Sequence, residues 1–125
     1  MESIGTLTKS DLRRMHSEYN RLYFGDKLSM PTFKWGTSSL PYGSYNMSAN
    51  VIQISVTAKR WTAVFLKDTL IHEMIHQYVY EYLGGCRYVL IQHGLRFHYV
   101  RWQLKRRYGL RISGSTIPKT FSPYE

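Results

Sequence analysis

The chain has 125 residues, of which 43% are hydrophobic and 20% charged, a length and composition that suit one domain with a buried core. No apolar run approaches the roughly 20 residues of a membrane span, and Cys86 as the single cysteine excludes an intrachain disulfide and a cysteine-based zinc ribbon. The N-terminus lacks the basic start and apolar core of a signal peptide. We therefore expect a cytoplasmic, nucleoid or nuclear protein that is not secreted and has no membrane partner.

The net charge of +9 is concentrated in the final third of the chain. Residues 1–81 contain nine Lys or Arg against seven Asp or Glu, whereas residues 82–125 contain eight Lys or Arg and one acid, Glu125. This asymmetry predicts a polyanionic partner, most commonly nucleic acid, although a solvated basic helix that only aids solubility is the alternative. The candidate phosphate contacts are Arg96, Arg101, Lys105, Arg106, Arg107 and Arg111.

The first predicted element is a helix that begins at the N-cap Thr8 and stops at Gly25. Helical spacing predicts that its core-facing side chains are Leu12, Met15, Tyr19, Leu22 and Tyr23.

Short β segments are predicted between Pro31 and Thr57. The first contains Phe33 and Trp35, the second Tyr45 and Met47, and the third is Val51–Val56, with Pro41 and Gly43 marking a turn. Their spacing favours antiparallel hairpins with connections of about 3–5 residues.

Two further helices are predicted, from near Thr62 to Leu83 and from Leu95 to Tyr108. The first is apolar on more than one side and should be the central, most buried helix. Gly109 ends the second, and residues 113–125 should form an irregular tail. We predict an α+β fold in which about three helices pack on a three-stranded sheet. It should form a single domain over residues 1–125, with its core in residues 8–112.

The run His72-Glu73-Met74-Ile75-His76 lies in the central predicted helix. Two histidines four residues apart share one helical face, so both imidazoles can reach one metal ion. The glutamate after the first histidine is placed to accept a proton from a metal-bound water. The pattern is typical of zincin metallohydrolases and assigns Glu73 as the general base.

A catalytic zinc ion normally takes three protein ligands, so a third ligand is needed besides His72 and His76. Val79 and Tyr82 stand where metzincins need glycine and histidine, which excludes that subfamily. The glutamates downstream of His76, Glu81 and Glu125, are poorly placed to serve as the third ligand. His93, followed by Gly94 at a predicted loop-to-helix junction, is the preferred ligand over His98, and His16 is predicted to be structural.

Several segments together resemble the SprT-like (Spartan-type) zinc metalloprotease family over about residues 8–112. The first is Tyr23-Phe24-Gly25-Asp26-Lys27-Leu28, followed by Lys34-Trp35-Gly36 and Ile52-Gln53-Ile54-Ser55. The most specific are Thr69-Leu70-Ile71-His72-Glu73-Met74-Ile75-His76 and His93-Gly94-Leu95-Arg96-Phe97. In the second of these the family's histidine is the third zinc ligand.

The resemblance implies a protease with a Zn²⁺ cofactor that acts on proteins bound or crosslinked to DNA, as in DNA–protein crosslink repair. Many relatives carry a C-terminal cysteine zinc ribbon, which this chain lacks, so DNA contacts would have to come from the domain's own surface. We expect a monomeric zinc endopeptidase whose substrate chain pairs with Gln53, Ile54 and Ser55 if that strand lies at the sheet edge. The alternatives are a zinc-containing nucleic-acid-binding or structural protein with idle protease chemistry, and, less favoured, a small-molecule zinc hydrolase.

Overall fold

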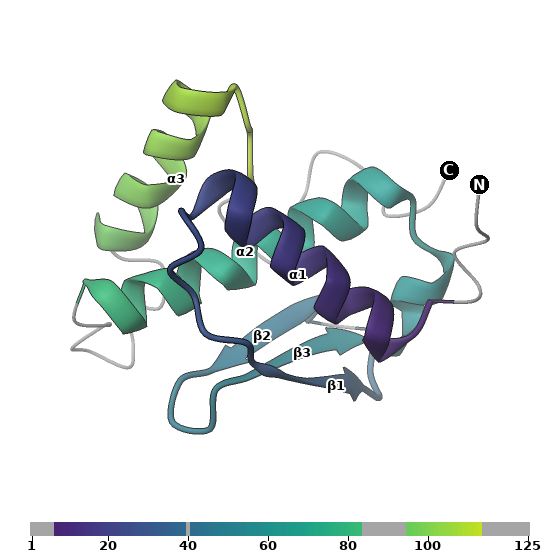
Figure 1. The fold of residues 1–125 in the computed structure, drawn as a ribbon. Coiled ribbons are helices and arrows are strands. Elements are labelled where there is room, and N and C mark those ends of the chain that lie inside the picture. Colours follow the sequence, from purple (N-terminus) through teal and green to yellow (C-terminus); the bar gives the residue numbers. More distant parts are fainter. Residues whose placement is uncertain (1–6, 40, 84–94, 114–125) are drawn as a thin grey trace.

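The computed structural model describes residues 7–39, 41–83 and 95–113. Its elements in chain order are α1 (Lys9–Tyr23), β1 (Thr32–Gly36), β2 (Gly43–Asn46), β3 (Val51–Ser55), the short 3₁₀ helix η2 (Val56–Arg60), α2 (Ala63–Tyr82) and α3 (Leu95–Tyr108). Figure 1 shows α1 and α2 over one face of the sheet, with α3 beyond α2. The predicted α+β fold of three helices and a three-stranded sheet is confirmed, and η2 is an addition that the sequence pattern did not indicate.

The sheet has the order β1-β3-β2, which corrects the expectation of antiparallel hairpins throughout. β2 and β3 do form an antiparallel hairpin, but β1 pairs with β3 in parallel, with Thr32 opposite Val51. The physical reason is that β1 packs against α1 and β2 against α2, so β3 fills the space between them. β2 ends at Asn46, so Met47 lies in the turn and not in the strand as predicted.

Thr8 caps α1 as the sequence predicts, and Thr62, near which the second helix was expected to begin, is the N-cap of α2. Thr8 and Asp11 form a capping box at the start of α1, and the Thr62 hydroxyl accepts the Phe65 N–H at the start of α2, at 3.2 Å. The buried face of α1 differs from the predicted stripe, because Leu22 is 40% exposed. The positions of α1 that are buried are Leu12, His16 and Asn20.

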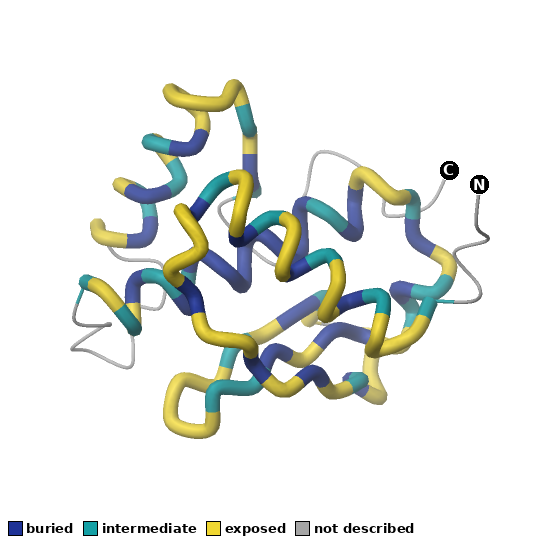
Figure 2. Tube along the Cα trace, viewed as in Figure 1, coloured by how far each residue is buried: buried dark blue, intermediate teal, exposed yellow. Residues whose placement is uncertain are grey.

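The core is centred on α2, as the sequence predicts. Leu70, Ile71, Met74 and Ile75 are fully buried, and the buried positions recur along the helix and the sheet in Figure 2. Apolar burial of this kind stabilises by about 25 cal/mol per Å², so α2 contributes much of the core. Its histidines and Glu73 are therefore mounted on the most firmly packed element.

After α3 the chain turns back onto α2. Gly109 adopts φ +65°, and its N–H donates to the Lys105 carbonyl at 2.9 Å, which ends the helix. We call Leu110–Ser113 the return segment. Its Ile112 is 5% exposed, and Ser113 is hydrogen-bonded to α2, so the predicted irregular tail begins with an anchored residue.

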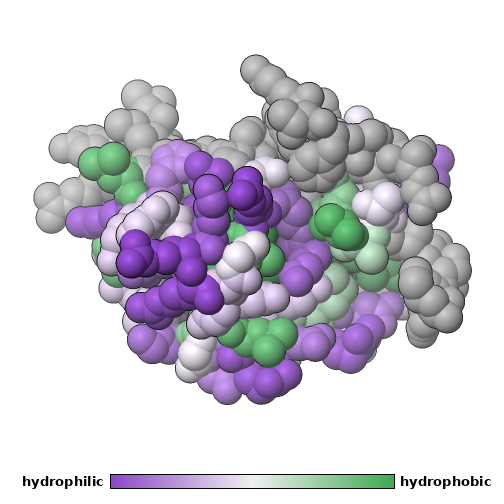
Figure 3. All heavy atoms as spheres, turned by 90° about the horizontal axis from the view of Figure 1, so that it is seen from above, coloured by the Kyte–Doolittle hydropathy of each residue, from purple (hydrophilic) through white to green (hydrophobic). Residues whose placement is uncertain are grey.

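The described surface is mainly hydrophilic on the face seen in Figure 3, where apolar side chains form small separate groups. Among the described helices, none combines the length and apolarity needed to cross a membrane.

Candidate metal and catalytic site

His72 and His76 lie one turn apart on α2, with ring centroids 5.1 Å from each other. Both rings contact Phe97 of α3, at centroid distances of 4.8 Å and 4.5 Å. Phe97 is 1% exposed, so α3 supplies an apolar wall that limits how the two imidazoles rotate. The sequence singles out Phe97 only as the last residue of the His93-Gly94-Leu95-Arg96-Phe97 segment, and nothing in that segment indicates its contact with both histidines.

The ring of His72 is further fixed by the return segment. Its Nδ1 lies 2.7 Å from the Ser113 carbonyl oxygen. A carbonyl only accepts hydrogen bonds, so in the neutral ring the proton sits on Nδ1 and the lone pair on Nε2. This is the arrangement in which metal-ligating histidines are commonly held.

Glu73 is buried beside these histidines, with an exposed fraction of 1%. Its Oε2 has no hydrogen-bond partner among the described residues. Burial raises the pKa of Glu73 from 4.5 to about 8, because the charged form loses its hydration. A buried carboxyl that lacks a partner requires a functional or structural explanation.

Gly43 at the start of β2 allows the strand to approach Glu73 closely. A Cβ at this position would lie 3.1 Å from Glu73 Oε2 and 3.1 Å from Thr69 Cγ2. The sequence predicts Gly43 in a turn, whereas in the structure Gly43 is the first residue of β2 and lies at one side of the site.

The predicted third ligand, His93, lies outside the described residues, as does Gly94. Within residues 7–39, 41–83 and 95–113, no three His, Cys, Asp or Glu side chains come together closely enough to hold a metal ion. The part that is described suits zinc: two adjacent imidazoles, one with a fixed tautomer, stand beside a buried unpartnered carboxyl. The assignment of His93 remains a prediction.

The residues rejected as ligands have other contacts. Glu81 accepts hydrogen bonds from Ser29 and Gln77, and the Tyr82 hydroxyl donates to the Lys27 carbonyl. His16 is fully buried, with its Nε2 2.9 Å from the Gln77 Oε1. The contact of His16 agrees with the structural role that the sequence predicts for it, and those of Glu81 and Tyr82 show what these side chains do instead of binding a metal ion.

The strand predicted to pair with substrate does not lie at the edge of the sheet, which that prediction required. Gln53, Ile54 and Ser55 belong to β3, the central strand, which has β1 on one side and β2 on the other. Its backbone hydrogen-bonding groups are used within the sheet, so an added chain has no free edge there. The edge beside Glu73 belongs to β2.

The basic residues of the final third lie on α3 and the return segment. Arg96 donates to the Leu83 carbonyl at 2.6 Å and Arg101 to the Ile112 carbonyl at 3.0 Å, so both link elements together. Arg106 lies over the Trp102 ring at 5.4 Å, and Arg107 is exposed. A pocket of about 280 Å³ is lined by His98, Arg101, Trp102, Lys105, Arg111 and Ile112.

Two aromatic side chains on this surface were not singled out from the sequence. Tyr99 and Trp102 are 52% and 50% exposed, and their rings stack at 6.2 Å. The signal was available, since aromatic residues three positions apart interleave with the arginines of α3.

A search of curated protein sequences finds no match to this chain. The sequence profile of the SprT-like family, by contrast, matches residues 12–116, from the first turn of α1 to past the end of the return segment. The chain therefore belongs to the SprT-like family, whose domains are of the zinc metalloprotease type.

Proposed function

We propose that this protein is a zinc-dependent endopeptidase that cleaves proteins bound or crosslinked to DNA. The observation that carries the proposal is the buried carboxyl of Glu73, whose Oε2 has no hydrogen-bond partner among the described residues and which follows His72 directly on α2. A purely structural metal site has no need of such a group.

His72, His76 and the predicted ligand His93 would hold the zinc ion. When bound, zinc polarises the scissile carbonyl and makes water at the site more acidic. Phe97 excludes solvent from one side of the two imidazoles, and the Ser113 carbonyl keeps the Nε2 lone pair of His72 available.

Glu73 acts as the general base and then as the general acid. Its carboxylate takes a proton from the attacking water as the new C–O bond forms. It then gives that proton to the leaving amine nitrogen as the C–N bond breaks. In the zinc-free protein burial raises the pKa of Glu73 to about 8, and the charge of a bound zinc ion would favour the carboxylate form that accepts the proton.

The edge of β2 is the place where we propose that the substrate backbone pairs. β2 uses one side for β3, and no described strand pairs with its other side. An extended peptide added there would lie beside Gly43, where even an added Cβ would come within 3.1 Å of Glu73 Oε2.

The aromatic and basic surface of α3 is the proposed DNA contact. Lys105 and Arg111 supply charge for phosphates, and the exposed rings of Tyr99 and Trp102 offer faces for unpaired bases. Stacking on these rings favours single strands, because bases inside a duplex are not available for it.

The test compares the wild type with Glu73→Gln for zinc content and for cleavage of a DNA-bound protein, with and without DNA. We expect equal zinc in both and cleavage in the wild type alone, stimulated by DNA. Glu81→Gln is the matched control, because Glu81 lies on the same helix outside the site and Gln keeps an acceptor for Ser29.

Each outcome bears on a separate part of the proposal. Cleavage by Glu73→Gln at the wild-type rate would contradict the role of Glu73 as the base. Zinc bound without cleavage by either protein would support the nucleic-acid-binding alternative. Cleavage that is indifferent to DNA would remove the DNA-linked substrate while leaving the peptidase intact.

A further inference from the structure

We propose that Asp68 is a positioning residue for the metal site, which it serves by anchoring Ser113 so that the Ser113 carbonyl holds the ring of His72. The inference rests on the proposed function in one respect, namely that His72 is a metal ligand. It concerns a residue that the sequence motif does not include.

Ser113 is held by two side chains of α2 that lie one helical turn apart. Its N–H donates to Asp68 Oδ1 at 2.9 Å, and its carbonyl accepts from His72 Nδ1 at 2.7 Å. Because residues four apart share one face of a helix, Asp68 and His72 bind opposite ends of the same residue. Asp68 thus helps to fix the position of the carbonyl that orients His72.

The return segment has a second anchor on α3. Arg101 donates to the Ile112 carbonyl at 3.0 Å, and the Ile112 side chain is buried. The Ile112 carbonyl and the Ser113 N–H belong to one planar peptide unit, so Arg101 holds the carbonyl end of the peptide whose N–H end is held by Asp68. Only the Asp68 bond, among those of the described residues, acts on the N–H of Ser113.

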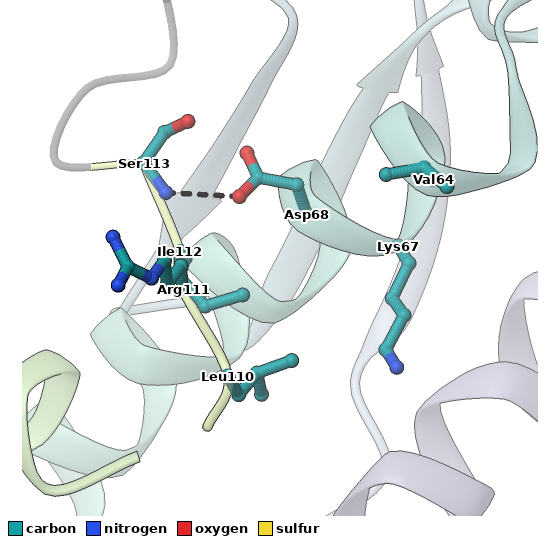
Figure 4. A pocket seen from close by; sticks show the side chains of 7 residues that line it. All are labelled: Val64, Lys67, Asp68, Leu110, Arg111, Ile112 and Ser113. Atoms are coloured by element: carbon teal, nitrogen blue, oxygen red, sulfur yellow. Dashed lines mark hydrogen bonds between the residues drawn. The ribbon is translucent and has the colours of Figure 1, made fainter. Parts of the chain in front are cut away.

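The carboxyl group of Asp68 interacts with Ser113 and with the positive charge of Arg101, which itself anchors the return segment. Asp68 is 8% exposed and lies at a pocket of about 550 Å³ between α2 and the return segment. Figure 4 shows its carboxyl directed at Ser113, while the neighbouring Lys67 points away from it. Lys67 instead contacts the Tyr23 hydroxyl at 3.2 Å. A buried carboxyl is costly without a partner, and the partners here are Ser113, whose carbonyl orients His72, and the charge of Arg101.

The test measures the zinc affinity of the full chain by competition with a chromophoric chelator. Asp68→Ala should raise the zinc dissociation constant by about 10- to 100-fold, the usual effect of removing an outer hydrogen bond at a metal site. Asp68→Asn keeps an oxygen acceptor for the Ser113 N–H, so it should restore affinity to within about threefold of the wild type. Water in the adjoining pocket can solvate the Ser113 N–H, so we expect Asp68→Ala to fold.

The control for a merely structural effect is Asn20→Ala. Asn20 also clamps a backbone residue, with bonds of 3.1 Å and 3.0 Å to the N–H and carbonyl of Leu28, but it lies on α1. It should lower the thermal midpoint and leave zinc affinity unchanged.

If the wild type binds zinc tightly and Asp68→Ala binds it equally well, the role of Asp68 is refuted while the proposed function stands. A wild type that binds no zinc would instead overturn the proposed function. Should Asp68→Ala fail to fold, ¹⁵N NMR of the zinc-loaded wild type decides, because the Ser113 bond requires a protonated Nδ1 on His72. A His72 ring that binds zinc through Nδ1 would refute the proposal.

Discussion

Replacing Glu73 with glutamine should stabilise the zinc-free protein while abolishing cleavage. Glu73 is buried, and its pKa is raised from 4.5 to about 8 by desolvation. In the unfolded chain at pH 7 the carboxyl is ionised, so folding requires it to take up a proton. Glutamine has the size and polarity of a protonated glutamate, so the comparison isolates the free energy of that proton uptake.

The magnitude follows from the two pKa values of the Glu73 carboxyl. At pH 7 the uptake costs the wild type about 3 kcal/mol, at about 1.4 kcal/mol for each pH unit above 4.5. Between pH 4.5 and pH 8 the native state binds more protons than the unfolded state, so wild-type stability falls as the pH rises. The advantage of Glu73→Gln should therefore be about 1 kcal/mol at pH 5 and about 3 kcal/mol at pH 7.

Urea unfolding of chelator-treated protein, followed by tryptophan fluorescence, measures this difference. Trp61 is 1% exposed and reports loss of the core. Glu18→Gln changes an exposed carboxyl and controls for the change of charge. Equal stability of Glu73→Gln and wild type at pH 7, or a difference that does not vary with pH, would refute the reasoning.

Three other predictions concern separate parts of the molecule. Gly43→Ala places a methyl group 3.1 Å from Glu73 Oε2 and should lower kcat about 10-fold by displacing the base. A loss of zinc content would contradict that reason. Burial lowers the pKa of His16 below 6.5, so the unfolded state takes up the proton first and stability falls as the pH drops below about 6.5. His16→Gln should reduce this slope in zinc-free unfolding curves. Trp102→Ala should weaken binding of a single-stranded oligonucleotide about 5- to 150-fold in fluorescence anisotropy, and an equal loss for duplex DNA would argue against stacking.

The helices were predictable because their signals are local. The capping box of Thr8 and Asp11, the N-cap Thr62 and the stop at Gly109 each depend on residues within one turn. The same holds for His72, Glu73 and His76, since helical geometry alone places them on adjoining faces of α2.

The sheet order was not predictable in this way. Alternation marks Val51–Ser55 as a strand but carries no information about its neighbours. β3 lies between β1 and β2 because α1 and α2 position the outer strands. The prediction that substrate pairs with Gln53, Ile54 and Ser55 failed because it needed this order of strands, which depends on tertiary packing.

The contacts that complete the site join residues far apart in the sequence. Ser113 meets His72 and Asp68 across more than 40 positions, and Gly43 meets Glu73 from another layer of the fold. Sequence spacing predicts which residues carry the chemistry, whereas packing decides which backbone groups orient them.

The burial of α2 explains why core and site occupy one helix in so small a domain. A raised pKa at Glu73 requires exclusion of water, and the described chain excludes water most fully around α2. Leu70, Ile71, Met74 and Ile75 supply that exclusion on the helix itself, while Phe97 supplies it from α3. The same apolar packing therefore stabilises the core and imposes the free-energy cost of burying the Glu73 carboxyl, so neither can be changed without changing the other.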